Sequence, residues 1–585
     1  MKKILMAVAV LSYMMMMAVV TACSENDDPQ TPSEDINKNT FSGSWIGEVT
    51  GNTYAIWNYG EAWNKLTFHT DGTGISDIYY TFEEQPVAHE QHSFTYTLTA
   101  DKLTLTVADD KKNYVYALSD NKLVKDNLVY YKGDAKTDSM IAQWNQIEMP
   151  AVPAPARYTV FVYGISGGKK DNIIEEGFWD VVKPYLTDST NVRVVCLHKY
   201  GKNTNSKYAK DGDVVWFELN SKTDLTKIRE NGIKALGYDV KTMSLKLYDP
   251  SMLRVFMEMS SLMCPAQDYI LTIWGHGNGF EPMYDKPGKF ATTATRGVIA
   301  DEWNNHEQLD MYELAEAIHS TGVGRLNTIF FHNCLMGNME TLTEVRDVAE
   351  YLVASAHVLS DSQGMLAAFV HSLQQTENVN EAMKLMFQTI RPAWDETYPN
   401  DSDHLLSGDL KLISCDALGN VIDATKLLAD RLVALYPTQR EAIDRATTKV
   451  YRYYLAVDDP NYNYYTPFFD LADYAHKLAE ETGDAGFATI ASDIDKAFSE
   501  AILQYADVNF AVQRLNHYTL SVCLFNQLFY DFDFIGAGLP WNCNIGEGYK
   551  QSTFHKLTGW GNWCHTNQKL PWGNPTSGGG GQLNK

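Results

Sequence analysis

The chain reads Tyr269-Ile270-Leu271-Thr272-Ile273-Trp274 and then Gly275-His276-Gly277-Asn278-Gly279. Further along it reads Thr328-Ile329-Phe330-Phe331 and then His332-Asn333-Cys334. Both apolar runs predict buried strands of a parallel sheet, because they are continuously apolar and rich in β-branched and aromatic residues. Ligands of open α/β sheets bind beyond the carboxyl ends of such strands. We therefore expect the histidine and the cysteine to meet in one crevice, as a thiol nucleophile and its base.

More apolar runs of this kind alternate with amphipathic segments. This alternation predicts a mostly parallel sheet with helices on both faces, followed by a mainly helical portion over 420–512. Late strands at Leu410–Ser414 and Thr519–Phe525 are expected to complete the sheet. The other expected strands are Tyr158–Tyr163, Val192–Leu197, Val214–Leu219, Tyr269–Trp274, Thr328–Phe331 and Tyr351–Ala354, and the expected helices are 307–320, 339–350, 421–435, 440–456, 467–482 and 486–505.

The first residues have the pattern of an exported lipoprotein. Lys2 and Lys3 precede an apolar stretch from Ile4 to Val20, and small residues then lead to Cys23. The stretch is short and ends in cleavage-site chemistry, so it predicts a signal peptide over 1–22 rather than a membrane span. Cys23 resembles the acylated cysteine of a bacterial lipobox, which implies a mature chain anchored by lipid to the outer membrane. The alternative is an ordinary secretory signal with an incidental cysteine.

An acidic stretch and a small β domain follow the cysteine. Ser24–Asp28 resembles the surface-export signal of Bacteroidota lipoproteins. Phe94–Leu98 and Leu103–Val107 alternate with period two, and short strands at such spacing predict a small barrel or sandwich. The opening Gly43-Ser44-Trp45 and the turn Asp71-Gly72-Thr73-Gly74 resemble lipocalin-like domains of such lipoproteins. The expected organisation is a signal peptide (1–22), a tether (23–40), a lipocalin-like β domain (41–135), a Pro-rich linker (136–156), a catalytic core (157–365), a mainly helical part with late strands (366–531) and an irregular Gly- and Trp-rich tail (532–585).

The net charge argues against one class of function, and the number of cysteines points to a free thiol. A formal net charge of −25 argues against nucleic-acid binding through a basic face. One of the 8 cysteines is the expected lipidation site, so an odd number remains and at least one thiol has no partner within the chain. Cys196, Cys264, Cys415 and Cys523 lie in or beside apolar runs and are expected to be buried. Cys334 differs, because it ends a run where a thiol can reach solvent.

The two turns carry the elements of acyl transfer. Cys334 would attack a carbonyl carbon, and His276 would keep the thiol deprotonated and later protonate the leaving amine. Gly275 and Gly277 permit a tight turn, and the N–H of Gly277 would join that of Cys334 in an oxyanion hole. A helix beginning near Gly337-Asn338 would favour the thiolate through its dipole. Taken alone, the histidine is better explained as a turn residue and the cysteine as a core thiol. Considered together these explanations weaken, because both residues end apolar runs on adjacent strand–helix units, and a Cys–His enzyme remains one of the alternatives.

Trp274–Gly277 and Asn333–Glu340 resemble the His and Cys motifs of the clostripain family of cysteine peptidases. Thr159–Tyr163, Phe468–Leu471 and Leu520–Val522 also fit that family, so the resemblance spans about 157–530. It implies a caspase-like α/β sandwich and an endopeptidase that works through a thioester, with His276 and Cys334 as its dyad and a preference for Arg or Lys at P1. The implied partners are a peptide or protein substrate and, through Cys23, a membrane; the chain is expected to be a monomer.

Some residues depart from the family pattern. His332 stands where members commonly carry an acid that helps bind a basic P1 side chain, and an imidazole would not attract Arg or Lys strongly. Asp361 is a candidate replacement in that pocket, or else a solvated loop acid. Ser355 is a further candidate for substrate binding. Two rival hypotheses remain, a catalytically silent surface-binding lipoprotein that retains the peptidase fold and a small-ligand binder in which the β domain carries the function.

No cofactor is expected, and nothing in the sequence decides on calcium. Four histidines between the two motifs and beyond them lack the mutual spacing of metal ligands, so no metal site is predicted. Neither a Gly-x-Ser-x-Gly elbow nor a P-loop spacing is present. The histidines in question are His306, His319, His357 and His404.

Overall fold

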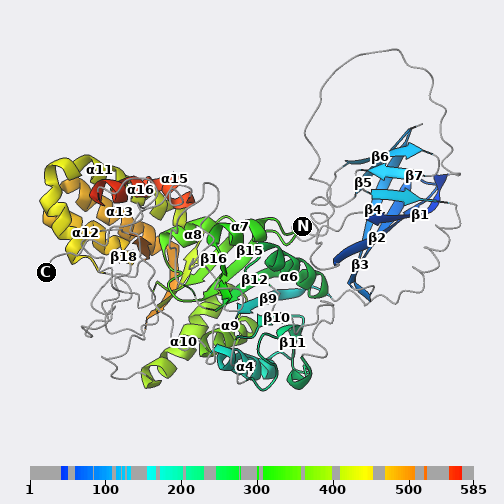
Figure 1. Cartoon of the computed structure of the whole chain (residues 1–585), viewed down its shortest axis with the longest axis horizontal. Helices are drawn as coiled ribbons and strands as arrows, with labels where there is room; N and C mark the ends of the chain where they lie inside the picture. The colour runs from blue at the N-terminus through cyan, green and yellow to red at the C-terminus, as the bar shows by residue number, and fades with distance from the viewer. Residues whose placement is uncertain are drawn as a thin grey trace, which may run out of the picture.

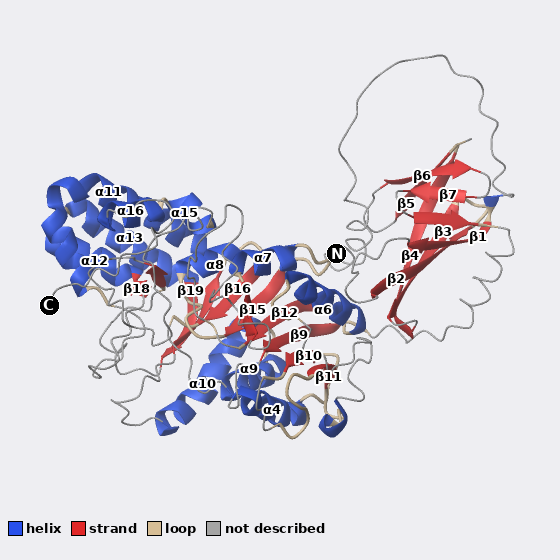
Figure 2. Ribbon diagram, in the orientation of Figure 1, coloured by secondary structure: helices blue, strands red, loops and turns tan. Residues whose placement is uncertain are grey.

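The chain is described by a computed structural model, shown in Figures 1 and 2. Within the described part, no helix is both long enough and apolar enough to span a bilayer. The described residues are 41–49, 59–82, 85–99, 101–107, 113–119, 122–125, 128–132, 154–165, 171–201, 206–228, 246–275, 277, 299–301, 307–356, 363–397, 409–451, 468–507, 520–523 and 552–568.

The N-terminal domain is a closed antiparallel barrel, as the period-two alternation predicted. Its last strand returns to pair with its first, Ile46 opposite Tyr131. Aromatic side chains fill the interior; the rings of Phe68 and Tyr96, for example, lie 5.0 Å apart at an edge-to-face angle. A packed interior of this kind suits a small barrel, whose centre is only wide enough for side chains. The strands are β1 (Gly43–Val49), β2 (Tyr59–Phe68), β3 (Thr73–Phe82), β4 (Gln85–Leu98), β5 (Lys102–Val107), β6 (Asn113–Ser119), β7 (Lys122–Lys125) and β8 (Leu128–Tyr131).

The second domain is built on a mixed sheet. Its five central strands are parallel. One strand at one edge and the first of two strands at the other run in the opposite direction, and the outermost strand on that second side runs with the central strands again. The early strands match the predicted runs within a few residues. In spatial order the sheet consists of β11 (Val214–Leu219), β10 (Val192–Lys199), β9 (Ala156–Ile165), β12 (Ala266–Trp274), β15 (Leu326–His332), β16 (Ala349–Ala354), β17 (Asp409–Ser414) and β19 (Ile502–Asp507).

Helices cover both faces of this sheet, so its central strands are apolar on both sides (Figure 1). Leu271 and Ile273 of β12 enter one core, whereas Ile270 and Trp274 enter the other. This is why the sequence shows a continuous apolar run instead of an alternation. The first face is covered by α6 (Pro250–Met263), α7 (Met311–His319) and α8 (Met339–Val345), and the second by α4 (Asp171–Val182), α9 (Gln363–Gln375) and α10 (Val379–Thr397).

The C-terminal helices continue the core that contains α8. We expected the tail to be irregular, but its described part, 552–568, forms two helices, and Trp560 and Trp563 of the second helix are fully buried. The backbone N–H and the hydroxyl of Thr553 both donate to the carboxylate of Glu344 on α8, at 2.5 and 2.8 Å. Pro437 lies within the long helix α11, which kinks near Gln439. The helices are α11 (Leu418–Lys449), α12 (Leu471–Thr482), α13 (Ala485–Ala501), α15 (Thr553–Thr558) and α16 (Trp560–Gln568).

Two late elements differ from the predictions. The predicted helix 486–505 ends at Ala501, and Ile502–Asp507 continues as strand β19, because it pairs with β17 at the edge of the sheet. The predicted strand Thr519–Phe525 does not join the large sheet. Its described part, β20 (Ser521–Cys523), pairs instead with β18 (Phe468–Asp470) in a separate two-stranded ribbon.

Candidate active site

The two strands singled out by the sequence are direct neighbours. β12 and β15 pair in parallel, and their last residues, Trp274 and His332, lie opposite each other in the register. The turns that follow therefore leave the same edge of the sheet side by side. Gly275, which begins the first turn, has φ of +150°. Few residues other than glycine adopt that backbone conformation, so the turn depends on this glycine.

A strained turn carries the cysteine. Leu335, directly after Cys334, has φ of +61°, and it is the only described residue other than glycine with a positive φ. A branched side chain in this left-handed region costs of order 1 kcal/mol, so surrounding contacts must hold the turn in place. Gly337 provides one, since its N–H donates to the carbonyl of Ser355 at 2.6 Å. A Cβ on Gly337 would come within 2.6 Å of the backbone N of Ala356, so only glycine permits this approach.

Asn338 also holds the turn that follows Cys334. Its side-chain oxygen accepts from the N–H of Thr341 and caps α8, while its side-chain amide donates to the carbonyl of Leu335 at 2.8 Å. Asn338 is fully buried. The sequence predicted a helix beginning near Gly337-Asn338, and α8 does begin at Met339. One side chain thus fixes both the turn after Cys334 and the start of the helix behind it.

The first turn packs directly onto the second. The side-chain amide of Asn333 donates to the carbonyl of Gly275 at 2.9 Å. Gly277 lies very close to Cys334. A Cβ on Gly277 would stand 2.6 Å from the carbonyl oxygen of Cys334 and 3.1 Å from its backbone N. The residues on either side of position 276 are therefore both in contact with the Asn333–Cys334 segment.

The predicted site residues fall into two groups. Gly277 and Cys334 lie together, and Ser355 is fully buried and bonded to the turn after Cys334. His332 is 3 % exposed, with its ring 4.2 Å from that of Trp274 and 5.8 Å from that of Phe330. The other predicted residues, His276, Asp361 and Cys23, lie outside the described residues.

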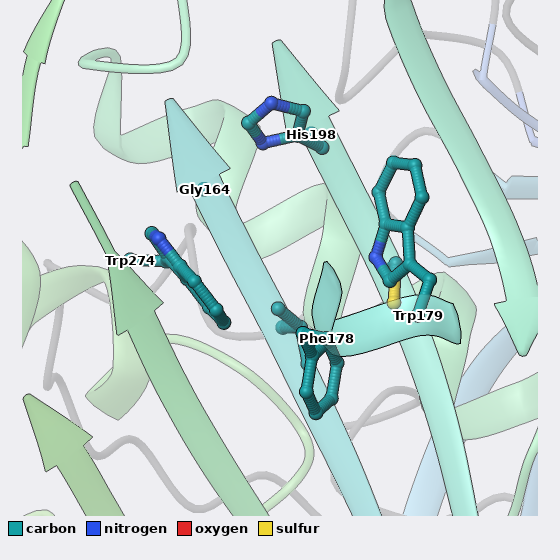
Figure 3. A pocket seen from close by; sticks show the side chains of 7 residues that line it. Gly164, Phe178, Trp179, His198 and Trp274 are labelled. Atoms are coloured by element: carbon teal, nitrogen blue, oxygen red, sulfur yellow. The ribbon is translucent and has the colours of Figure 1, made fainter. Parts of the chain in front are cut away.

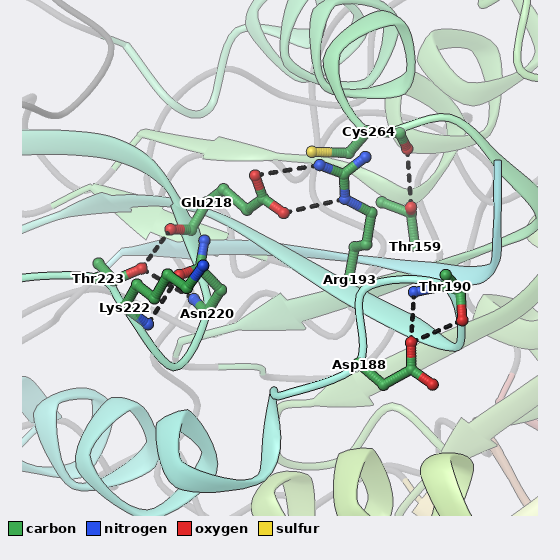
Figure 4. A network of polar contacts seen from close by, with 9 residues as sticks. All are labelled: Thr159, Asp188, Thr190, Arg193, Glu218, Asn220, Lys222, Thr223 and Cys264. Carbon is green, nitrogen blue, oxygen red and sulfur yellow. Dashed lines mark hydrogen bonds and ion pairs between the residues drawn. The ribbon is translucent and has the colours of Figure 1, made fainter. Parts of the chain in front are cut away.

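Exposure separates Cys334 from the cysteines expected in the core. Cys196, Cys264 and Cys415 are buried, as predicted, whereas Cys334 is partly exposed. Burial raises the pKa of Cys264 and of Cys415 to about 12, so neither forms a thiolate readily. Cys264 lies at the opposite, amino edge of the parallel strands, beside the ion pair of Arg193 with Glu218 (Figure 4). Of these thiols only Cys334 is placed to react.

A small hollow lies next to the site on the α4 face. In the sheet register Gly164 lies between His198 on one side and Trp274 on the other, so its missing side chain leaves a gap between the imidazole and the indole (Figure 3). The space between its lining atoms amounts to about 210 Å³, part of which is open to solvent. No carboxylate is among its described lining residues, so it offers no partner to a basic side chain. The lining residues are Val162, Gly164, Phe178, Trp179, Cys196, His198 and Trp274.

Sequence reasoning missed Asn333, and it identified Asn338 only as part of a helix start. An Asn before a helix is a readable capping signal. The bond from Asn333 to Gly275 joins two segments far apart in the sequence, and no local pattern announces it. Among the described residues, no group of three or more His, Cys, Asp or Glu side chains is placed to hold a metal ion.

A family model and several solved structures match this chain. The model of the clostripain family, peptidase C11, matches residues 188–518. A secreted C11 cysteine protease from Bacteroides thetaiotaomicron, solved with an irreversible peptide inhibitor, is 14% identical; the match covers 70% of this chain and 100% of that chain, with a TM-score of 0.45. An inactive zymogen C11 protease from Parabacteroides distasonis is 14% identical over 70% of this chain and 99% of that one, with a TM-score of 0.44. A comparison with curated protein sequences finds no match.

The family match covers more than half of the chain, including both strands that lead into the site. Its span runs from the segment before β10 to the segment before β20, and so takes in most of the mixed sheet. The chain belongs to the clostripain family and is a cysteine-type peptidase.

Proposed function

We propose that the chain is an endopeptidase that hydrolyses peptide bonds with Cys334 as nucleophile and His276 as base. One observation carries the proposal: the residues on both sides of position 276 contact the Asn333–Cys334 segment, through the bond to Gly275 and the packing of Gly277. Consecutive Cα atoms lie only about 3.8 Å apart, so these two contacts support the proposal of a base at position 276 near the thiol.

The reaction follows from these groups. The sulfur of Cys334 attacks the carbonyl carbon of the scissile bond, and His276 takes the thiol proton. The N–H groups of Gly277 and Cys334 donate to the oxyanion; the close packing of these two residues supports this pairing. The C–N bond then breaks as the imidazolium of His276 protonates the amine. Water adds to the thioester, His276 accepts its proton, and the acid and the free thiol are released.

The P1 preference is proposed to be Arg or Lys. His332 and Ser355 flank the Cys334 turn and, with Asp361, form the proposed substrate-binding set. A basic P1 side chain needs a carboxylate, and neither the described lining of the hollow nor the buried His332 supplies one. Asp361 is therefore assigned that role, and Asp361→Asn should selectively weaken cleavage after Arg and Lys.

The wider setting is also a proposal. The parallel central strands with helices on both faces support a caspase-like arrangement. The closed N-terminal barrel supports a lipocalin-like module between the peptidase and a lipid anchor at Cys23 on the outer membrane. Metabolic labelling with a radioactive fatty acid tests the anchor, because Cys23→Ser should abolish incorporation. Equal labelling of both forms would contradict it.

A covalent probe tests the catalytic assignment. Peptidyl acyloxymethyl ketones with Lys, Arg or Leu at P1 should alkylate Cys334 in the wild type, as located by mass spectrometry of the labelled peptide. Cys334→Ala should abolish labelling and His276→Ala should slow it strongly, whereas Cys415→Ala, which removes a buried thiol, should label normally. A wild type that neither labels nor cleaves peptides would instead favour a silent binding protein.

A further inference from the structure

Asn333 stands directly before the proposed nucleophile, yet its side chain reaches the other turn. We propose that Asn333 is a positioning residue that holds the backbone on both sides of His276 against the Cys334 turn, and so sets the approach of the imidazole to the sulfur. This inference rests on the proposed dyad. It goes beyond it by assigning the coupling between the two turns to a single side chain.

Two contacts made by Asn333 carry the argument. Its amide nitrogen donates to the carbonyl oxygen of Gly275 at 2.9 Å, immediately before position 276. Its Cβ would stand 2.5 Å from a Cβ added to Gly277, immediately after that position. Asn333 is only 1 % exposed, so the bond is shielded from competing water. One buried side chain therefore touches the backbone on both sides of the proposed base.

Two residues of the first turn are described, and both are glycines. Gly275 and Gly277 carry no side chains that could pack or bond, and glycine has more backbone freedom to lose than any other residue. A turn of this composition needs restraint from outside, and the Asn333 amide provides a directional one. The other turn is restrained separately by Asn338, which bonds to the carbonyl of Leu335. Asn333 therefore restrains the turn after β12, and Asn338 restrains the turn after β15.

The chemistry of the amide makes the proposal testable with an isosteric change. Asn333→Asp keeps the shape of the side chain but removes the donor, so two acceptor oxygens would face each other at Gly275. Asn333→Ala removes the bond to Gly275 altogether and keeps the Cβ that lies close to Gly277. A misplacement of about 1 Å between reacting groups is enough to lower the rate about 100-fold. We expect both variants to lose between about 10-fold and 100-fold in kcat with KM changed less than about threefold, because the peptide-binding surface is untouched.

The decisive readout is the reactivity of Cys334 itself. The rate of its alkylation by iodoacetamide is measured against pH in the full-length protein, below the melting temperature of each variant. An imidazolium held near the sulfur favours the thiolate, so loss of positioning should move the midpoint of this profile to higher pH in both variants. A purely structural role for Asn333 would lower the melting temperature and leave this midpoint unchanged.

Asn420→Asp is the matched control. Its amide also donates at 2.9 Å, to Glu500 on the surface of the helical region, and the variant should retain the wild-type kcat and alkylation profile. If Asn333→Ala does not fold, Asn333→Asp carries the test alone. Wild-type kcat and an unshifted profile in a folded Asn333→Asp would overturn the positioning role. An inactive wild type, or full activity in His276→Ala, would overturn the proposed dyad instead.

Discussion

Replacing Gly277 with alanine probes the tightest contact in the site. The added Cβ would stand 2.5 Å from the Cβ of Asn333 and 2.6 Å from the carbonyl oxygen of Cys334. Carbon atoms in good contact are about 3.5–4.0 Å apart, so one of the two turns must move by roughly 1 Å. Asn333 and Cys334 are both fixed by the strand before them, so the Gly277 segment is expected to give way. Its N–H then no longer points at the oxyanion.

The expected loss can be estimated from that displacement. Removing one oxyanion donor typically lowers kcat by about 10²–10³, or roughly 2.7–4 kcal/mol. We expect Gly277→Ala to lose about 100-fold in kcat, with KM within about threefold, because substrate binding away from the oxyanion is unchanged. Overpacking should also reduce the free energy of unfolding by about 1–3 kcal/mol.

Initial rates on a fluorogenic peptide give kcat and KM, and circular dichroism confirms folding at the assay temperature. Gly364→Ala on α9 is the matched control, since a Cβ there meets nothing within 4 Å. It should retain the wild-type kcat. A folded Gly277→Ala enzyme with kcat within about threefold of the wild type would refute the assignment of Gly277 to the oxyanion hole.

Three further predictions concern stability. Trp560→Ala should lower the free energy of unfolding, measured by chemical denaturation, by about 3–5 kcal/mol, because the indole is fully buried. Leu557→Ala, at a side chain that is 42% exposed, should have little effect. Equal effects of the two substitutions would contradict the docking of the C-terminal helices. Burial raises the pKa of Glu344 above its ordinary 4.5, so the fold favours the protonated carboxyl and stability is lost as pH rises through that raised pKa. Glu344→Gln should accordingly melt at a higher temperature than the wild type at alkaline pH, with a difference that shrinks as the pH falls toward 4.5; a difference independent of pH would contradict this. Asp484→Ala should lower the free energy of unfolding by about 1–2 kcal/mol, because Asp484 both caps α13 and pairs with Arg431. Asp484→Asn should lower it less, since asparagine keeps the cap. Equal decreases for the two variants would show that the cap contributes nothing.

The core strands could be predicted from sequence because both of their faces are buried. β12 and β15 are short apolar runs without polar alternation, and the helical segment between them, which contains α7, predicts their parallel pairing. The same logic predicts Gly277 beside Cys334, where the structure has it. β19 could not be found this way. It follows α13 without a Gly or Pro break, and only its pairing with β17, far away in the sequence, makes it a strand.

The helices of the C-terminal tail have local start and stop signals in the sequence, but the unusual composition of the tail obscured them. The tail was expected to be irregular because it is rich in Gly and Trp. Ser552 nevertheless caps α15, and Gly559, with φ of +69°, ends it, which are ordinary start and stop signals. The left-handed Leu335 and the bond made by Asn333 belong to a different category. Both depend on contacts between segments that only the folded chain brings together, so no local pattern predicts them.

The bond from Thr553 to Glu344 joins residues 209 positions apart and connects the C-terminal helices to α8, the helix that follows Cys334. A ribosome makes Glu344 long before it makes Thr553, so during synthesis the helix behind Cys334 lacks its outer layer. The complete scaffold of the peptidase can therefore assemble only once the last helices have been made. The core that packs against α8 is complete only after Trp560 and Trp563, two of its members, have been synthesised.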